Sequence, residues 1–292
     1  MFEGVYVAIV TPFKNGKIDE EAYKNLIEMH VKKGTDGIIP CGTTGESATL
    51  SHEEHEYLIE LTVKLVNGRM KVVAGTGSNS TEEAIKLTKA AEKVGCDGAL
   101  LVSPYYNKPT QKGLYEHFKK IAESVKIPLI LYNIKSRTAV NIEIKTMCEL
   151  SKIPNIVGVK EASGDLSQMS EIIRLCGNDF TVLSGDDALT LPLVSIGGKG
   201  VISVVGNFIP EDLKHMLESY KSGNIEEAKK IHHKLFPLIK AMFIETNPIP
   251  VKAAMEMLGL IGPEIRLPLT RLEGENREKV KKALIDYGLK VQ

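Results

Sequence analysis

One lysine lies where its amine could act as a nucleophile. Lys160 follows the apolar run 156–159 and precedes Glu161. A solvated lysine has a pKa near 10.4 and is protonated at neutral pH, so it cannot attack a carbonyl carbon. Desolvation lowers that pKa and frees the amine to form a Schiff base with a keto acid. A structural salt bridge, to Glu161 or to a group on a neighbouring strand, explains the same lysine equally well.

Two threonines follow another apolar run, 37–40. Thr43 and Thr44 lie between two glycines and precede a predicted helix. Hydroxyls and backbone N–H groups in such a loop can bind an anion, because a helix N-terminus favours negative charge. A plain turn in which the threonines cap the helix is the alternative.

Tyrosines and an arginine follow two further runs. Tyr105 and Tyr106 come after one run, where packing aromatics are the commoner case. Tyr132 ends the next run, and Arg137 follows five residues later. A phenol can transfer protons, and a guanidinium group binds a carboxylate through two parallel hydrogen bonds. Taken alone, Arg137 is also typical of a surface or a helix cap.

The elements that must position these residues repeat one pattern. A short apolar, β-branched run is followed by turn residues and then by an amphipathic helical stretch. The eight runs are 5–10, 37–40, 71–74, 99–102, 129–132, 156–160, 180–183 and 200–204. Strands that alternate with helices pair in parallel, and eight such units favour a closed (β/α)8 barrel of the α/β class. Ser51 to Glu54 resembles a capping box that opens one of the helices.

The part of the chain after the eighth run, 211–292, is predicted to be almost entirely helical, with breaks at 222–224, 247–250 and 259–263. We place a boundary near Asn224, with a catalytic barrel over 1–224 and a small helical region over 225–292. In barrels of this type the active site lies at the carboxyl ends of the strands. The polar residues that follow the runs are therefore expected to meet at one mouth of the barrel.

Composition narrows the function classes. The 292 residues include 37 basic and 37 acidic residues, which argues against nucleic acid or an acidic membrane as a main partner. No secretory signal is visible and no stretch reaches the roughly 20 apolar residues of a membrane span. The four cysteines are scattered without a disulfide or metal spacing, as expected in a reducing cytoplasm. We expect a cytoplasmic protein without a metal site.

Five sequence blocks together resemble the dihydrodipicolinate synthase branch of the pyruvate-dependent aldolase and N-acetylneuraminate lyase family. The resemblance runs from Thr11 to Leu269, and its strongest blocks are 42–47, 104–110, 159–162, 183–187 and 247–252. It implies a lyase of the hydro-lyase class with a class I aldolase mechanism. Its substrates would be pyruvate and L-aspartate 4-semialdehyde, in the diaminopimelate route of lysine biosynthesis. No cofactor is implied beyond the covalent imine.

The resemblance also implies roles for the candidate residues. Lys160 would form the imine with pyruvate, and Thr43 and Thr44 would hold the pyruvate carboxylate. Thr44 would join Tyr132 and Tyr106 in a proton relay, with Tyr132 as the general acid and base. In the family, the second tyrosine reaches the site of a neighbouring subunit, which implies an oligomer, expected to be a homotetramer built as a dimer of dimers.

The second substrate would be held by Arg137, which would bind the carboxylate of the semialdehyde. Backbone groups near Gly185 and Ile202 would line the pocket. The sequence departs from the family pattern at Lys135, where proline is usual. Proline fixes φ and stiffens the preceding residue, whereas lysine does neither, so the direction of Arg137 must be set without that constraint.

A second, regulatory site is implied for L-lysine, the inhibitor of some family members. The matching positions are Ser47, Ala48, His52, His55, Asn79, Glu83 and Tyr105. The two histidines are not a zinc motif, because that motif needs histidines four residues apart. Solvated histidines on a helix face are the alternative.

Two other functions compete with the synthase. A sister lyase would cleave a sugar or sialic keto acid through the same imine, but it would need hydroxyl-binding groups in place of Arg137. A barrel that only binds a ligand would not need Lys160 together with its tyrosines. The arginine and the threonine pair favour the synthase.

Overall fold

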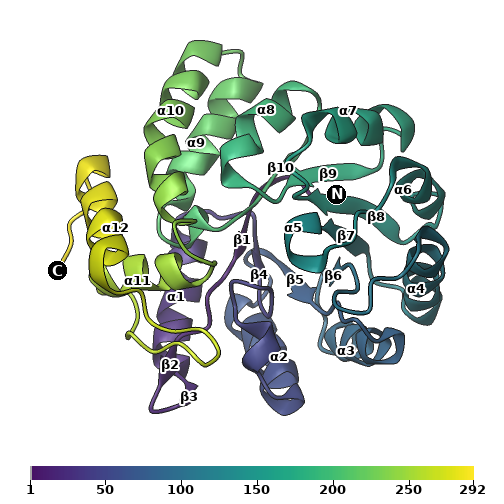
Figure 1. The fold of residues 1–292 in the computed structure, drawn as a ribbon, viewed down its shortest axis with the longest axis horizontal. Coiled ribbons are helices and arrows are strands. Elements are labelled where there is room, and N and C mark those ends of the chain that lie inside the picture. Colours follow the sequence, from purple (N-terminus) through teal and green to yellow (C-terminus); the bar gives the residue numbers. More distant parts are fainter. Residues whose placement is uncertain (1) are drawn as a thin grey trace.

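Eight parallel strands close into a barrel in the computed structural model, which describes residues 2–292 (Figure 1). The strands are β1 (Gly4–Ala8), β4 (Gly37–Ile39), β5 (Lys71–Gly75), β6 (Gly98–Val102), β7 (Leu129–Asn133), β8 (Ile156–Glu161), β9 (Thr181–Ser184) and β10 (Gly200–Ser203). Each predicted run coincides with one strand to within two residues at either end. The predicted (β/α)8 barrel is confirmed.

Helices cover the outside of the barrel (Figure 1). They are α1 (Glu20–Lys32), α2 (His52–Val66), α3 (Thr81–Lys93), α4 (Gln111–Ser124), α6 (Ile144–Leu150), α7 (Leu166–Leu175), α8 (Thr190–Ser195) and α9 (Pro210–Lys221). In α4, the buried residues Leu114, Phe118 and Ile121 recur at helical spacing and form one apolar face. The capping box of α2 is confirmed, because Ser51 and Glu54 each bond the other's backbone N–H.

Shorter strands and helices lie in the connections between the barrel elements. A hairpin of β2 (Phe13–Lys14) and β3 (Lys17–Ile18) follows β1, and the short helix α5 (Lys135–Thr138) follows β7. Single 3-10 turns lie at 47–49, 187–189 and 205–207.

The two faces of the barrel strands bury different cores. Side chains alternate along a strand, so one set points into the barrel and the next packs beneath the helices. Tyr6, Ile130 and Ile202 belong to the interior cluster, whereas Leu129 and Leu131 pack against the outer helices. Because Tyr132 and Lys160 are register partners in β7 and β8, their side chains share one face of the sheet.

The C-terminal part contains α10 (Ile225–Ala241), α11 (Ile249–Met257) and α12 (Gly274–Tyr287). The predicted break at 259–263 is longer in the structure, because the whole stretch 258–273 has no regular helix and contains two prolines. Leu235 and Ala254 share a hydrophobic cluster with Val5 of the first strand. The boundary near Asn224 therefore stays a prediction, since the helices on both sides of it share this core.

No helix within residues 2–292 combines the length and the apolar character that a bilayer crossing requires.

The interior cluster fills the barrel below the carboxyl ends of its strands, and Ile130 allows its packing to be tested. This side chain is 1% exposed. We expect Ile130→Ala to lower the free energy of unfolding by ~2–5 kcal/mol, because the lost methyl groups leave a cavity. Denaturant unfolding at a fixed protein concentration measures the loss. Ile285→Ala, at a half-exposed position of α12, is the control, and an equal loss in both variants would contradict the assignment.

Candidate active site

A cavity of about 80 Å³ lies at the carboxyl ends of the barrel strands. It is lined by six of the eight residues predicted for catalysis and substrate binding: Thr43, Thr44, Tyr132, Arg137, Lys160 and Gly185. Tyr106 and Ile202 do not line it. The cavity therefore brings together the predicted amine, the predicted phenol and the predicted carboxylate clamp.

The amine of Lys160 is held away from water. The residue is 6% exposed, and Nζ lies 4.2 Å above the centre of the Tyr132 ring. The pKa of Lys160 is lowered to about 7, mainly by burial; the carboxylate of Asp187 acts to raise it and the positive charge of Arg137 acts to lower it. A large fraction of the amine is thus unprotonated near neutral pH, as a Schiff-base nucleophile requires.

The salt-bridge interpretation of Lys160 is wrong for the described residues. Glu161 is fully buried, but its oxygens accept hydrogen bonds from Asn133 and Gln168 at 3.0–3.2 Å. The backbone N–H of Ser163 donates to the same carboxylate at 2.7 Å. Since neighbouring side chains in β8 point to opposite faces, Glu161 faces these amides and Lys160 faces the cavity.

The threonine beside Tyr132 is Thr43. Thr43 and Tyr132 both line the cavity, and burial raises the pKa of the Tyr132 phenol to about 12, although Arg137 and the Thr43 side chain act to lower it. Thr44 is buried instead, and its Oγ1 accepts a hydrogen bond from Asn247 Nδ2 at 2.9 Å. The relay predicted for Thr44 and Tyr132 stays a prediction, while Thr43 is the threonine that acts on the Tyr132 pKa and the Thr44 hydroxyl is bonded to Asn247.

Tyr106 lies away from the cavity. It is 90% exposed and its backbone has a φ of 70°, in the left-handed region that few residues other than glycine adopt. Within one chain it contacts neither Lys160 nor Tyr132. Its predicted role in the site of a neighbouring subunit stays a prediction.

Arg137 reaches the cavity despite the unusual lysine before it. Lys135 is the exposed first residue of α5, a position that suits proline but does not require it. The Arg137 guanidinium donates from Nη2 to the backbone oxygen of Asn247 at 3.1 Å. The remaining N–H groups stay available to a carboxylate in the cavity.

Gly185 leaves room for the reactive lysine. A Cβ atom at this position would lie 3.1 Å from both Cγ and Cε of Lys160 and 2.7 Å from Cβ of Ala162. Ile202 instead packs in the interior cluster, and Val204, two residues later, lines the cavity. The role predicted for backbone groups near Ile202 stays a prediction.

A second cavity of about 470 Å³ adjoins the first, and Thr43, Arg137 and Asn247 line both. Six of the seven residues predicted for L-lysine line this second cavity: Ser47, Ala48, His52, His55, Glu83 and Tyr105. Asn79 does not, and its backbone oxygen accepts from Asn107 at 2.9 Å.

Acidic and imidazole groups meet in the second cavity. His52 Nε2 lies 2.7 Å from Glu83 Oε1, and both groups are partly exposed. His55 is buried, and burial lowers its pKa to about 4, so this imidazole is neutral at pH 7. The cavity therefore offers a carboxylate for a cationic ligand and a neutral ring beside it.

Two site residues carried no local sequence signal. Asn247 joins Thr44 through its side chain and Arg137 through its backbone oxygen, and its Oδ1 has no partner among residues 2–292. Asp187 is buried where Val204 N–H donates to it at 2.9 Å, and burial raises its pKa to about 6. Both lie in blocks that carry the family resemblance, which was the only sequence evidence for them.

The charges around Lys160 predict opposite pKa shifts for two variants. We expect Asp187→Asn to lower the pKa of Lys160, because a carboxylate that stabilises the ammonium is lost. We expect Arg137→Gln to raise that pKa, because a repelling positive charge is lost. The rate at which acetic anhydride acetylates Lys160 over a pH series, followed by mass spectrometry, measures both shifts.

Lys135→Gln is the matched control for this pair. Lys135 lies two residues from Arg137 but is exposed and does not line the cavity, so its removal should leave the acetylation midpoint unchanged. Shifts of Asp187→Asn and Arg137→Gln in the same direction would contradict the electrostatic assignment.

Comparisons with known proteins agree over the whole chain. The model of the Dihydrodipicolinate synthetase family matches residues 1–286. The 4-hydroxy-tetrahydrodipicolinate synthase of Thermodesulfovibrio yellowstonii is 60% identical over 99% of both chains. The crystal structure of dihydrodipicolinate synthase from Aquifex aeolicus is 53% identical, with a TM-score of 0.98 over 100% of both chains.

A third relative was solved with a ligand. The crystal structure of the synthase from Cyanidioschyzon merolae with lysine bound is 46% identical, with a TM-score of 0.96 over 99% of both chains. The match to the family model, the relatives' identity over nearly the full length, and the shared barrel all agree. The chain belongs to the dihydrodipicolinate synthetase family.

Proposed function

We propose that the chain acts as a 4-hydroxy-tetrahydrodipicolinate synthase, a lyase (EC 4.3.3.7) that condenses pyruvate with L-aspartate 4-semialdehyde. This step belongs to the diaminopimelate route of lysine biosynthesis. The observation that carries the proposal is the buried Lys160 amine, with its pKa near 7, in a cavity shared with Tyr132. The covalent imine needs no cofactor.

The first half of the reaction activates pyruvate. The neutral Lys160 amine attacks the keto carbon, and the resulting carbinolamine loses water to give a protonated imine. Tyr132, which lines the cavity together with Thr43, supplies and removes the protons of these steps. The imine withdraws electrons, so the pyruvate methyl group loses a proton and becomes the carbon nucleophile of an enamine.

The second half joins the two substrates. The enamine carbon attacks the aldehyde carbon, and the amino group of the new chain then attacks the imine carbon. That attack closes a six-membered ring and releases Lys160 as a free amine. One water is lost for each product formed, so the atoms balance.

The residues around the amine select the substrates. Thr43 and the backbone of the loop near it hold the pyruvate carboxylate, and the free N–H groups of Arg137 hold the carboxylate of the semialdehyde. A sugar keto acid would need hydroxyl-binding groups at the position of Arg137. The guanidinium therefore supports the semialdehyde over a sugar or sialic acid.

The second cavity is proposed as a regulatory site for L-lysine. Glu83 offers a carboxylate to the ammonium groups of this ligand, and His52, His55 and Tyr105 supply polar edges. The relative solved with lysine bound supports this choice of ligand. Since both cavities share Thr43, a ligand in the second one contacts the loop of the first.

A homotetramer, built as a dimer of dimers, is proposed as the active assembly. The exposed Tyr106 supports it, because this side chain is free to enter the site of a neighbouring copy. The cytoplasmic location stays a prediction.

The proposed reaction is tested by substrate and by adduct. We expect turnover with pyruvate and L-aspartate 4-semialdehyde, and none with N-acetylneuraminate. Borohydride added with pyruvate alone should leave a reduced adduct on the Lys160 peptide, detected by mass spectrometry, because the imine is formed before the second substrate binds.

The adduct has its own control. Lys160→Met should abolish both adduct and turnover, whereas Lys135→Gln should retain both. Turnover of the sugar acid alone would overturn the substrate assignment. Folded wild-type protein without an adduct would overturn the Schiff base.

Regulation through the second cavity is a separate prediction. We expect L-lysine to inhibit turnover, and His55→Ala to weaken that inhibition by roughly tenfold through the loss of one buried polar contact. Inhibition curves at fixed substrate concentrations measure the change. His233→Ala, on a helix that does not line the cavity, is the control. Equal inhibition of wild type and His55→Ala would remove His55 from the site.

A further inference from the structure

The loop that carries Thr43 and Thr44 is bounded by two strained residues. Cys41 and Glu46 both have a φ of 56°, in the left-handed region that non-glycine residues rarely adopt. Such conformations persist only where the surroundings hold them, and they cluster at functional sites. The groups that hold this loop are therefore of interest for the site.

Glu46 is held by a buried ion pair. Its Oε1 lies 2.5 Å from Nζ of Lys252 in α11, and the exposed fractions of the two side chains are 0% and 5%. The backbone N–H of Arg266 donates to Oε2 at 3.0 Å. Both carboxylate oxygens thus have a donor from the C-terminal part of the chain.

The same lysine also ties the loop to the segment after β1. Lys252 Nζ donates to the backbone oxygen of Thr11 at 3.0 Å, and Thr11 Oγ1 donates to the backbone oxygen of Gly45 at 2.7 Å. The Glu46 N–H in turn donates to the backbone oxygen of Thr43 at 3.1 Å. A closed set of contacts therefore connects Lys252 to the threonine beside Tyr132.

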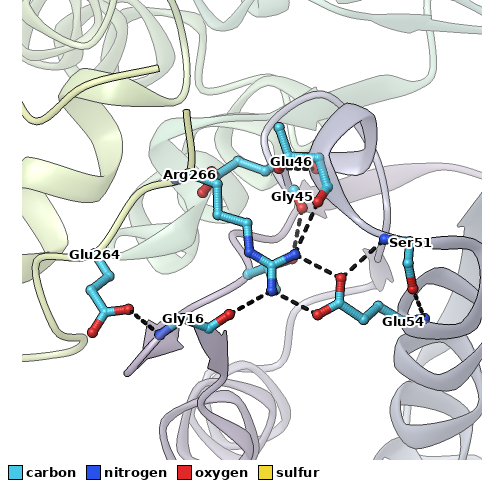
Figure 2. Close-up of polar contacts among 9 residues, drawn as sticks. Gly16, Gly45, Glu46, Ser51, Glu54, Glu264 and Arg266 are labelled. Atoms are coloured by element: carbon cyan, nitrogen blue, oxygen red, sulfur yellow. Dashed lines mark hydrogen bonds and ion pairs between the residues drawn. The ribbon is translucent and has the colours of Figure 1, made fainter. Parts of the chain in front are cut away.

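The side chain of Arg266 anchors the segment whose backbone donates to Glu46. Figure 2 shows its guanidinium between Glu54 and Gly16, and both terminal nitrogens donate to the Glu54 carboxylate at 2.6 Å. A further bond at 2.9 Å reaches the backbone oxygen of Thr49. The segment that donates to Glu46 is thus anchored on α2 and on the β2–β3 hairpin.

A buried ion pair is not in itself a source of stability, because well-packed apolar residues often replace one without loss. Its geometric effect is specific, since it fixes where a charged side chain must lie. We propose that Glu46 and Lys252 are positioning residues that hold the Thr43–Thr44 loop in the conformation that binds the pyruvate carboxylate. This inference rests on the proposed function, in which that loop holds pyruvate.

The test separates positioning from folding. Glu46→Gln leaves Lys252 buried without its counter-charge, whereas Glu46→Gln combined with Lys252→Met removes both charges at similar volume. We expect both variants to raise the KM for pyruvate by about tenfold to a hundredfold, because the loop is misplaced. The KM for the semialdehyde should stay close to that of wild type. Arg277→Gln, which breaks a partly exposed ion pair at the other end of α11, is the matched control.

Adduct formation on Lys160 distinguishes a failure of the proposed function from a failure of the positioning role. Borohydride at saturating pyruvate should still label Lys160 in the double variant, because the amine is intact and only the binding loop is displaced. No label in wild type would overturn the proposed function itself. A folded double variant with the wild-type KM for pyruvate would overturn the positioning role.

A milder variant covers the case in which neither charge variant folds. Thr11→Val removes only the hydrogen bond to Gly45, and we expect a smaller rise in the KM for pyruvate with the melting temperature little changed. An unchanged KM in this folded variant would also overturn the proposal.

Discussion

The removal of one amine from water is the constraint on which the rest of the site depends. Lys160 is buried with an aromatic face beside it, where a carboxylate in contact would have restored its charge. The next residue in the strand is such a carboxylate, Glu161. The pleat turns it to the other face, where Asn133 and Gln168 satisfy its oxygens with neutral amides. The reactivity of the amine thus follows from the alternation of a single strand.

Neighbouring groups then adjust the pKa of the Lys160 amine without forming an ion pair with it. Asp187 favours the ammonium form and Arg137 opposes it, so the two charges partly offset each other at Lys160. Gly185 leaves the space that the lysine side chain needs. Gly185 and Asp187 follow β9, whereas Arg137 follows β7, and the closed barrel brings the ends of these strands to one mouth with Lys160 of β8.

The strands and the nucleophile could be predicted because their signals are local. Buried parallel strands appear as unbroken apolar runs, and Lys160 and Tyr132 end two of them. The distinction between Thr43 and Thr44 could not be predicted, because it depends on a turn in which Cys41 and Glu46 take dihedral angles that their residue types disfavour.

Other parts of the site depend on contacts that no local pattern encodes. Asn247 meets Thr44 across 203 positions of sequence, and only the folded chain shows that contact. The length of the non-helical stretch 258–273, of which only 259–263 was predicted, has a similar reason, because contacts such as Arg266 with Glu54 hold its later part.

The contact between Glu46 and Lys252 spans 206 positions, and this separation sets an order of events during synthesis. Chains leave the ribosome from the N-terminus at about 5–20 residues per second. All eight barrel strands are therefore made before Lys252 and Arg266 exist. A nascent chain can already contain the strand that carries the amine while the Thr43–Thr44 loop still lacks its partners. The last fifth of the polypeptide thus completes a site whose reactive group was translated long before it.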